Sequence, residues 1–104
     1  MTTATVEGVR EIIRANVYDP EIGMNIVDLG LVYDIKVPEG KNAEIEMTLT
    51  SPGCPIGPQI ISAVQTYVKK GYPDLDAINI HIVWNPMWSP DMMTQEAKDM
   101  LGFF

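Results

Sequence analysis

Hydrophobic and polar residues alternate along three segments of the chain, which is the pattern of β-strands that bury one face. The first two such segments are Tyr33–Val37 and Ala43–Leu49, and they are separated by the turn-forming residues Pro38–Asn42. A connection this short predicts an antiparallel hairpin. The third segment is Ile78–Trp84, where isoleucines alternate with asparagine and histidine.

Apolar residues follow helical spacing in three other segments. The first covers Val6–Val17, with Thr5 as its N-cap. The second begins near Pro58 and ends near Gly71, because proline suits the first turn of a helix and glycine suits its end. The third is expected to begin at the Ser89–Pro90 pair and to end at Gly102 for the same reasons.

Each predicted strand has one apolar and one polar face, so helices are expected to cover only one side of the sheet. The fold class is therefore α+β, a two-layer sandwich whose small mixed sheet has three or four strands. The 104 residues suit one domain, covering residues 1–104.

The charge and composition of the chain exclude some classes of binding partner. Seven basic residues against fourteen acidic ones give a formal net charge of −7, which repels phosphate backbones and anionic lipid. We therefore expect no nucleic-acid partner and no membrane partner. Residues 1–7 lack the basic and apolar regions of a signal peptide, and no apolar stretch is long enough for a membrane span. We expect a soluble cytoplasmic protein.

Three loops are predicted to meet at one edge of the sheet. The hairpin brings the start of its first strand beside the end of its second, and the following helix makes the third strand parallel to the second. Residues 19–28, 51–55 and 85–91 then converge. Function concentrates on loops held by a rigid scaffold, so we place the candidate site at this edge.

Cys54 is the only cysteine, which excludes an internal disulfide and a four-cysteine metal site within one chain. It precedes the helix that starts near Pro58, where a helix N-terminus favours the thiolate, a nucleophile and soft-metal ligand. The alternative is a small buried residue. His81 lies in mid-strand, away from this edge, so a Cys–His catalytic dyad is not expected. We predict that the protein is not an enzyme.

The same loops carry further candidates. Asp19, Glu21 and Asp28 are either hard ligands or, as acidic residues in turns usually are, acceptors for loop amides. Asp91 is explained by a favourable interaction with the start of the last predicted helix. Trp88 either closes over the Cys54 pocket or anchors a partner.

Three segments, in order along the chain, resemble one known family. They are Asp19–Tyr33, Met47–Pro55 and Trp88–Lys98, which contain the sequences DPE, NIVDLGLVY, MTLTSPGCP and WSPDMMTQEAK. The chain resembles the SufT-like family of iron–sulfur cluster assembly domains. The resemblance implies an FSCA-type α+β fold and a role as carrier or targeting factor in the maturation of iron–sulfur proteins. It implies iron–sulfur assembly machinery and client apoproteins as partners.

The resemblance also implies which residues form the site. Cys54 matches the motif cysteine, and Asp19, Glu21, Asp28 and Trp88 fall on other motif positions. The predicted site loops and partner contacts further include the neighbouring residues Thr50, Pro52, Gly53, Pro55 and Asp91. Because each chain has one thiol, two interpretations remain. Either two chains of a homodimer each donate Cys54 to a transient iron ion or iron–sulfur cluster, or the protein binds partners without a cluster.

Two other functions stay open. In the first, the protein is an interaction module in which Trp88 and the polar sheet face dock partners and Cys54 is structural. In the second, it is a thiol-dependent enzyme, which is disfavoured because no base lies near the thiol. An assembly factor of the phenylacetate-degradation type is also disfavoured, because the Cys-rich extension of those members does not follow Phe104.

Overall fold

The computed structural model describes residues 4–20, 22–50 and 57–102. None of the helices in these residues is long and apolar enough to cross a membrane. Short 3₁₀ turns cover Pro38–Gly40 and Pro90–Met92. In chain order the helices and strands are α1 (Val6–Asn16), β1 (Tyr18–Asp19), β2 (Met24–Asn25), β3 (Val32–Lys36), β4 (Asn42–Met47), α2 (Gly57–Gly71), β5 (Ala77–Ile82) and α3 (Gln95–Leu101).

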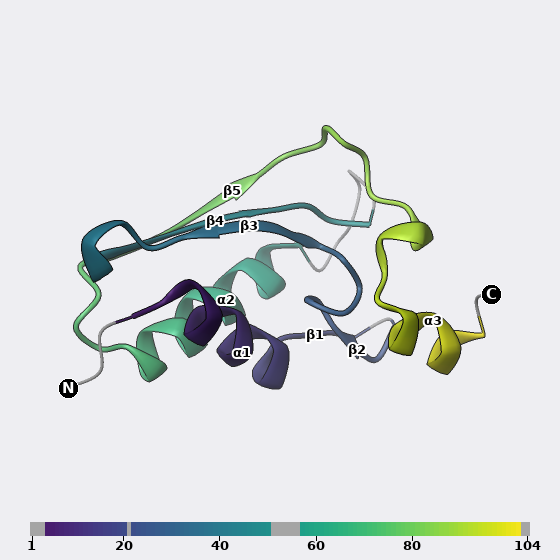
Figure 1. Cartoon of the computed structure of the whole chain (residues 1–104), viewed down its shortest axis with the longest axis horizontal. Coiled ribbons are helices and arrows are strands. Elements are labelled where there is room, and N and C mark those ends of the chain that lie inside the picture. Colours follow the sequence, from purple (N-terminus) through teal and green to yellow (C-terminus); the bar gives the residue numbers. More distant parts are fainter. Residues whose placement is uncertain (1–3, 21, 51–56, 103–104) are drawn as a thin grey trace.

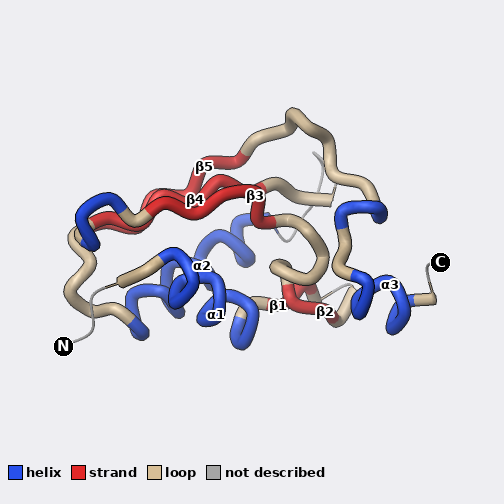
Figure 2. Tube along the Cα trace, viewed as in Figure 1, coloured by secondary structure: helices blue, strands red, loops and turns tan. Residues whose placement is uncertain are grey.

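The main sheet has the strand order β3–β4–β5. Strands β3 and β4 are antiparallel, and β5 is parallel to β4. Helices α1 and α2 lie on one side of this sheet, while β1, β2 and α3 lie toward one end of it (Figures 1 and 2). The predicted two-layer α+β architecture is confirmed.

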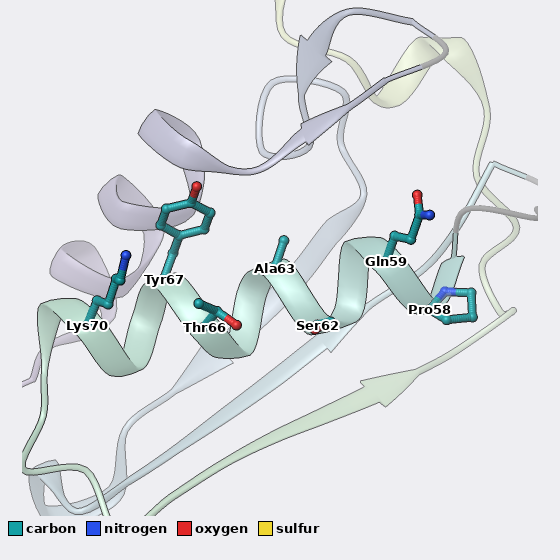
Figure 3. Close-up of a pocket in the computed structure, with 7 residues that line it drawn as sticks. All are labelled: Pro58, Gln59, Ser62, Ala63, Thr66, Tyr67 and Lys70. Atoms are coloured by element: carbon teal, nitrogen blue, oxygen red, sulfur yellow. The ribbon is translucent and has the colours of Figure 1, made fainter.

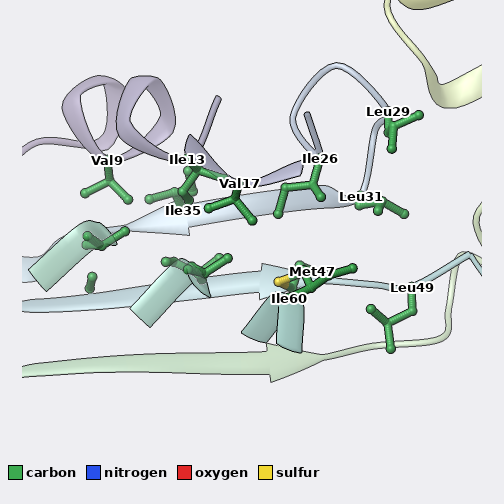
Figure 4. Packing of buried hydrophobic residues seen from close by; sticks show 14 of the residues in the cluster. Val9, Ile13, Val17, Ile26, Leu29, Leu31, Ile35, Met47, Leu49 and Ile60 are labelled. Atoms are coloured by element: carbon green, nitrogen blue, oxygen red, sulfur yellow. The ribbon is translucent and has the colours of Figure 1, made fainter. Parts of the chain in front are cut away.

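The hydrophobic core fills the space between the sheet and the two long helices (Figure 4). Its centre is β4, whose inward side chains Ala43, Ile45 and Met47 are fully buried. Burial of a side chain such as Ile45 or Met47 contributes about 1.5–3 kcal/mol, so the core that surrounds β4 is a large part of the stability of the domain. The helices contribute the buried residues Val9, Ile13, Ile60, Val64 and Val68.

The segment between α1 and β3 contains a small hairpin that the hydrophobic pattern does not reveal. Strands β1 and β2 pair antiparallel, and each has only two residues, which is too short for an alternating pattern to appear. Two amides close the connecting turn on Asp19, since Gly23 N–H donates to its carbonyl oxygen at 2.7 Å and Ile22 N–H donates to its Oδ1 at 3.3 Å.

The prediction that the last helix starts at the Ser89–Pro90 pair is wrong. Ser89 makes no capping hydrogen bond and precedes only the 3₁₀ turn Pro90–Met92. The chain then becomes extended at Met93, whose side chain is buried in the core. Helix α3 begins later, with Thr94 as N-cap accepting a hydrogen bond from Ala97 N–H. Its predicted end at Gly102 is confirmed by a left-handed φ of 82°.

A matched pair of variants tests which residue, Ser89 or Thr94, is the N-cap of α3. We expect Thr94→Ala to lower the free energy of unfolding by about 1 kcal/mol, because an N-cap oxygen is lost. Ser89→Ala is expected to change it by less than about half of that amount, because surface substitutions without such a role have small effects. Urea unfolding followed by circular dichroism measures both. Equal losses in the two variants would contradict the assignment of Thr94 as the cap.

Candidate functional site

The loop after β5 is bonded to the loop before β3, as the predicted convergence requires. The Trp88 indole Nε1–H donates to the Leu29 carbonyl at 2.7 Å. The Tyr33 hydroxyl donates to the Pro86 carbonyl at 2.8 Å. Residues 85–91 thus approach the segment before β3 as predicted, although the two hydrogen bonds reach Leu29 and the β3 residue Tyr33, just beyond the predicted range 19–28. We call this contact the loop junction.

The third predicted loop belongs to the segment 51–56, which lies outside the described residues. The residues on either side of this segment are placed at the same end of the sheet. Thr48 N–H donates to the Leu31 carbonyl at 2.8 Å, and Thr50 is partly buried. Gly57 packs so closely on Leu49 that a Cβ there would lie 2.8 Å from Leu49 Cδ1. The predicted site residues that lie outside the described residues are Glu21, Pro52, Gly53, Cys54 and Pro55.

Gly30 allows a close approach of the main chain to Met92, next to the loop junction. Its φ is +81°, in the left-handed region that glycine tolerates. A Cβ at this position would overlap the main-chain carbonyl of Met92. The close approach of residue 30 to the Met92 main chain therefore requires that residue 30 has no side chain.

Asp28 connects three parts of the chain. Its carboxylate accepts a hydrogen bond from Asn25 Nδ2 at 2.8 Å and lies 3.4 Å from a guanidinium nitrogen of Arg14 in α1. Its carbonyl oxygen accepts from Thr94 N–H at 2.9 Å, at the start of α3. Asp28 is 7% exposed, so these contacts hold the loop from within. Arg14 also lies 3.9 Å from Glu96, a link that the sequence pattern does not signal.

The other predicted acidic residues differ in environment. Asp19 is 2% exposed and is the last residue of β1, where it accepts hydrogen bonds from the turn that follows. Asp91 is exposed and lies in the 3₁₀ turn Pro90–Met92. The described residues contain no group of three or more His, Cys, Asp or Glu side chains that could hold a metal ion.

A shallow groove of about 570 Å³ lies beside the loop junction. Tyr33 lines it, and burial raises the pKa of this hydroxyl, although a hydrogen bond with Thr48 acts in the opposite direction. Trp84 and Met87, in the segment that follows β5, are 41% and 67% exposed. The groove lining combines apolar side chains with a carboxylate and a hydroxyl, and consists of Val27, Gly30, Val32, Tyr33, Glu46, Pro86 and Met92.

A second groove, of about 490 Å³, runs along the outer surface of α2 (Figure 3). It extends from Pro58 to Lys70, and the Lys70 ammonium lies 5.8 Å from the centre of the Tyr67 ring. Among the described residues that the sequence predicted for the site, none lines this groove. It is therefore separate from the loop junction.

The polar face of the sheet contains a small hydrogen-bonded group around Glu44. Asn79 Nδ2 donates to its Oε2 at 2.6 Å, and His81 Nε2 lies 3.2 Å from its Oε1. These two hydrogen bonds, that of Asn79 first, lower the pKa of Glu44. His81 is solvent-exposed, as the sequence predicts, but the alternating pattern gives no sign of its carboxylate partner on β4.

Comparison with known proteins identifies relatives of nearly the same length. A family described as "Iron-sulfur cluster assembly protein" matches residues 7–82. The chain is 48% identical over 86 residues to the Fe-S protein maturation auxiliary factor SufT of Staphylococcus aureus, covering 83% of this chain and 97% of that protein. It is also 48% identical over 89 residues to the Fe-S protein maturation auxiliary factor YitW of Bacillus subtilis, covering 83% of each.

Solved structures share the fold. A domain of unknown function, DUF59, from Bacillus anthracis superposes with a TM-score of 0.89 at 42% identity, covering 95% of this chain and 92% of that one. A protein of Mycobacterium tuberculosis described as associated with Fe–S complex assembly and repair gives a TM-score of 0.54 at 38% identity, covering 99% of this chain and 93% of that one.

The close approach at Gly30 predicts a difference between two glycine substitutions. Gly23 and Gly30 have φ values of +80° and +81°, but an added Cβ would meet other atoms within 4 Å at Gly30 and none at Gly23. Gly23→Ala is expected to cost about 1–2 kcal/mol from the left-handed backbone alone. Gly30→Ala is expected to cost a further 1–3 kcal/mol, roughly, because Met92 must move. Urea unfolding measures both losses, and a Gly30→Ala loss no larger than that of Gly23→Ala would contradict the tight contact.

The Glu44 group predicts a pH effect. Because its folded-state pKa lies below the ordinary value of 4.5, Glu44 stabilises the fold above that pH, and this contribution is lost as the pH falls through the folded-state pKa. In Asn79→Ala we expect the Glu44 pKa to move back toward 4.5. Carboxyl NMR titration measures it, with Asn42→Ala as a control at an exposed position of β4. An unchanged Glu44 titration in Asn79→Ala would contradict the assignment.

Proposed function

Since the chain belongs to the family of iron–sulfur cluster assembly proteins, we propose that it is an auxiliary factor in the maturation of iron–sulfur proteins. Identities of 48% to two factors named for this role support the proposal. The protein acts as a carrier or targeting factor in the cytoplasm and has no catalytic turnover of its own. Its partners are iron–sulfur assembly machinery and client apoproteins.

The observation that carries this proposal is the position of the two anchors of the Cys54 segment. Leu49 and Gly57 pack closely against each other, so the segment that contains the only cysteine of the chain begins and ends at residues that the core holds in place. Prolines 52 and 55 limit the conformations of such a segment in the unfolded chain. A reactive group on a short connection between rigid elements suits the presentation of cargo to a partner.

Iron or an iron–sulfur cluster is the cargo in this proposal. Thiolate is the ligand that iron–sulfur clusters prefer, and Cys54 is the one residue of this chain that supplies it. One thiol does not complete a cluster site, and no group of metal-binding side chains is formed by the described residues. The remaining ligands would come from Cys54 of a second copy or from the thiols of a client.

The groove beside the loop junction favours a second candidate, an interaction module without a cluster. Trp84 and Met87 expose apolar surface in the segment that also contributes Pro86 to the groove. Exposed aromatic and methionine side chains next to a groove are typical of partner contacts. In this candidate Cys54 is structural, and Trp88 acts by holding the partner surface in place.

A complementation experiment tests the leading proposal. In a bacterial strain that lacks its own auxiliary factor, the wild-type chain is expected to restore the activity of a labile iron–sulfur enzyme. Cys54→Ser is expected to reduce the restored activity at least about tenfold, because a serine oxygen is a poor ligand for soft metals. Immunoblotting confirms equal protein levels. Failure of the wild-type chain to restore activity would overturn the proposed function.

The same assay separates the two candidates. Full activity with Cys54→Ser, combined with loss of activity and of client capture in Trp88→Ala, would favour the interaction module. Trp88→Phe is the matched control, because it keeps a smaller aromatic ring and removes the hydrogen bond to Leu29. In the carrier proposal Cys54→Ser still captures clients and fails only in delivering the cluster.

A further inference from the structure

The two edges of the main sheet differ in how they are protected against pairing with another strand. Edge strand β3 carries Asp34 and Lys36, and its register with β4 shifts between Val32 and Asp34. Charges and such irregularities are the usual protection of an edge. Edge strand β5, with the sequence AINIHI, contains no proline, no Asp, Glu, Lys or Arg, and no register shift against β4. One edge is protected, and the other is open.

The main chain of β5 has hydrogen-bonding groups that its partner strand does not use. Val83 N–H donates to the Met47 carbonyl of β4 at 2.9 Å. Because successive residues of a strand alternate in direction, Asn79 and His81 also turn their main-chain groups toward β4. The main-chain N–H and C=O groups of Ile78, Ile80 and Ile82 therefore point away from β4. Among the described strands β5 pairs only with β4, and it forms the outer margin of the sheet in Figure 1.

We propose that β5 is a homodimer interface, in which it pairs antiparallel with β5 of a second copy around a twofold axis at Ile80. In this register Ile80 faces the partner's Ile80, and Ile78 faces the partner's Ile82. Each of these pairs exchanges both main-chain hydrogen bonds, so every outward-pointing group of the strand is used. The two sheets of three strands become one continuous sheet.

The side-chain pattern of β5 is complementary to itself in this register. The isoleucines are each only partly buried in one chain, and all of them lie on the helix-covered face, where isoleucine meets isoleucine. On the polar face Asn79 meets the partner's His81, so no like charges are placed opposite each other. The chain has a net charge of −7, and an uncharged strand is where a second copy can approach without direct repulsion. These features favour a second copy over an unrelated segment.

The pairing does not depend on the proposed function. It needs neither Cys54 nor a cluster, so a monomeric protein would leave the maturation role standing. An inactive protein would likewise leave the pairing standing.

Sedimentation velocity of the full chain over micromolar to millimolar concentration tests the proposal. We expect a dimer that dissociates on dilution. Ile80→Lys places two ammonium groups opposite each other at the axis and is expected to raise the dissociation constant at least about tenfold. Ala15→Lys adds the same charge on the exposed surface of α1 and is expected to leave the dissociation constant unchanged. Circular dichroism confirms that both variants fold. A monomeric wild-type chain, or a dimer equally affected by both variants, would overturn the proposal.

Cross-linking tests the register without disturbing the apolar face. In the Cys54→Ser background, Asn79→Cys and His81→Cys are prepared as separate proteins. In this register Asn79 and the partner's His81 are opposite each other without exchanging main-chain hydrogen bonds. The Cα atoms of such an antiparallel pair are about 4.5 Å apart, a distance that a disulfide can bridge. We expect mild oxidation to link the mixture of the two variants at least about fivefold faster than either variant alone, because Asn79 faces the partner's His81 and not itself. Equal rates in the mixture and in the single variants would overturn this register.

Discussion

The burial of β4 is the constraint on which the rest of the structure depends. Its side chains Ala43, Ile45 and Met47 are fully enclosed beneath the helices, and its main chain is paired on both sides. A strand in this position cannot shift by one residue without turning its whole apolar face to solvent. Its two partner strands are therefore fixed in register, and so are the ends from which the site loops emerge. The loop junction is a consequence of core packing.

Much of the architecture could be predicted from the sequence because it follows from strong, local patterns. The alternation in β3, β4 and β5 and the helical spacing in α1 and α2 identify each element and the single covered face of the sheet. The start of α3 was not predictable in the same way. Ser89 and Thr94 are both reasonable N-caps, and the choice is made by tertiary contacts. Met93 enters the core, and Thr94 N–H bonds to the distant Asp28 carbonyl.

In the candidate site, too, one part could be predicted from the sequence and another part depends on tertiary contacts. Loop convergence follows from topology, and it could be predicted before any side chain was placed. The specific contacts could not, because they depend on geometry that no pattern encodes. Examples are the Arg14–Asp28 ion pair and the hydrogen bond from Tyr33 to Pro86. Asp28 illustrates the limit well: its position in a family motif suggests a functional role, and only the structure shows that its contacts hold three segments of the chain together.

The loop junction also has a consequence for the order of folding. Its two hydrogen bonds join residues that are 53 and 59 positions apart, whereas the β3–β4 hairpin closes over a short turn. Closing a long loop costs more chain entropy than closing a short one, so contacts of large sequence separation are expected to form after local ones. The hairpin can form early, but the junction requires that α2 has crossed and β5 has docked. The loop junction is thus completed only in a chain whose core is already assembled, and an incompletely folded chain lacks the groove that Tyr33 and Pro86 help to form there.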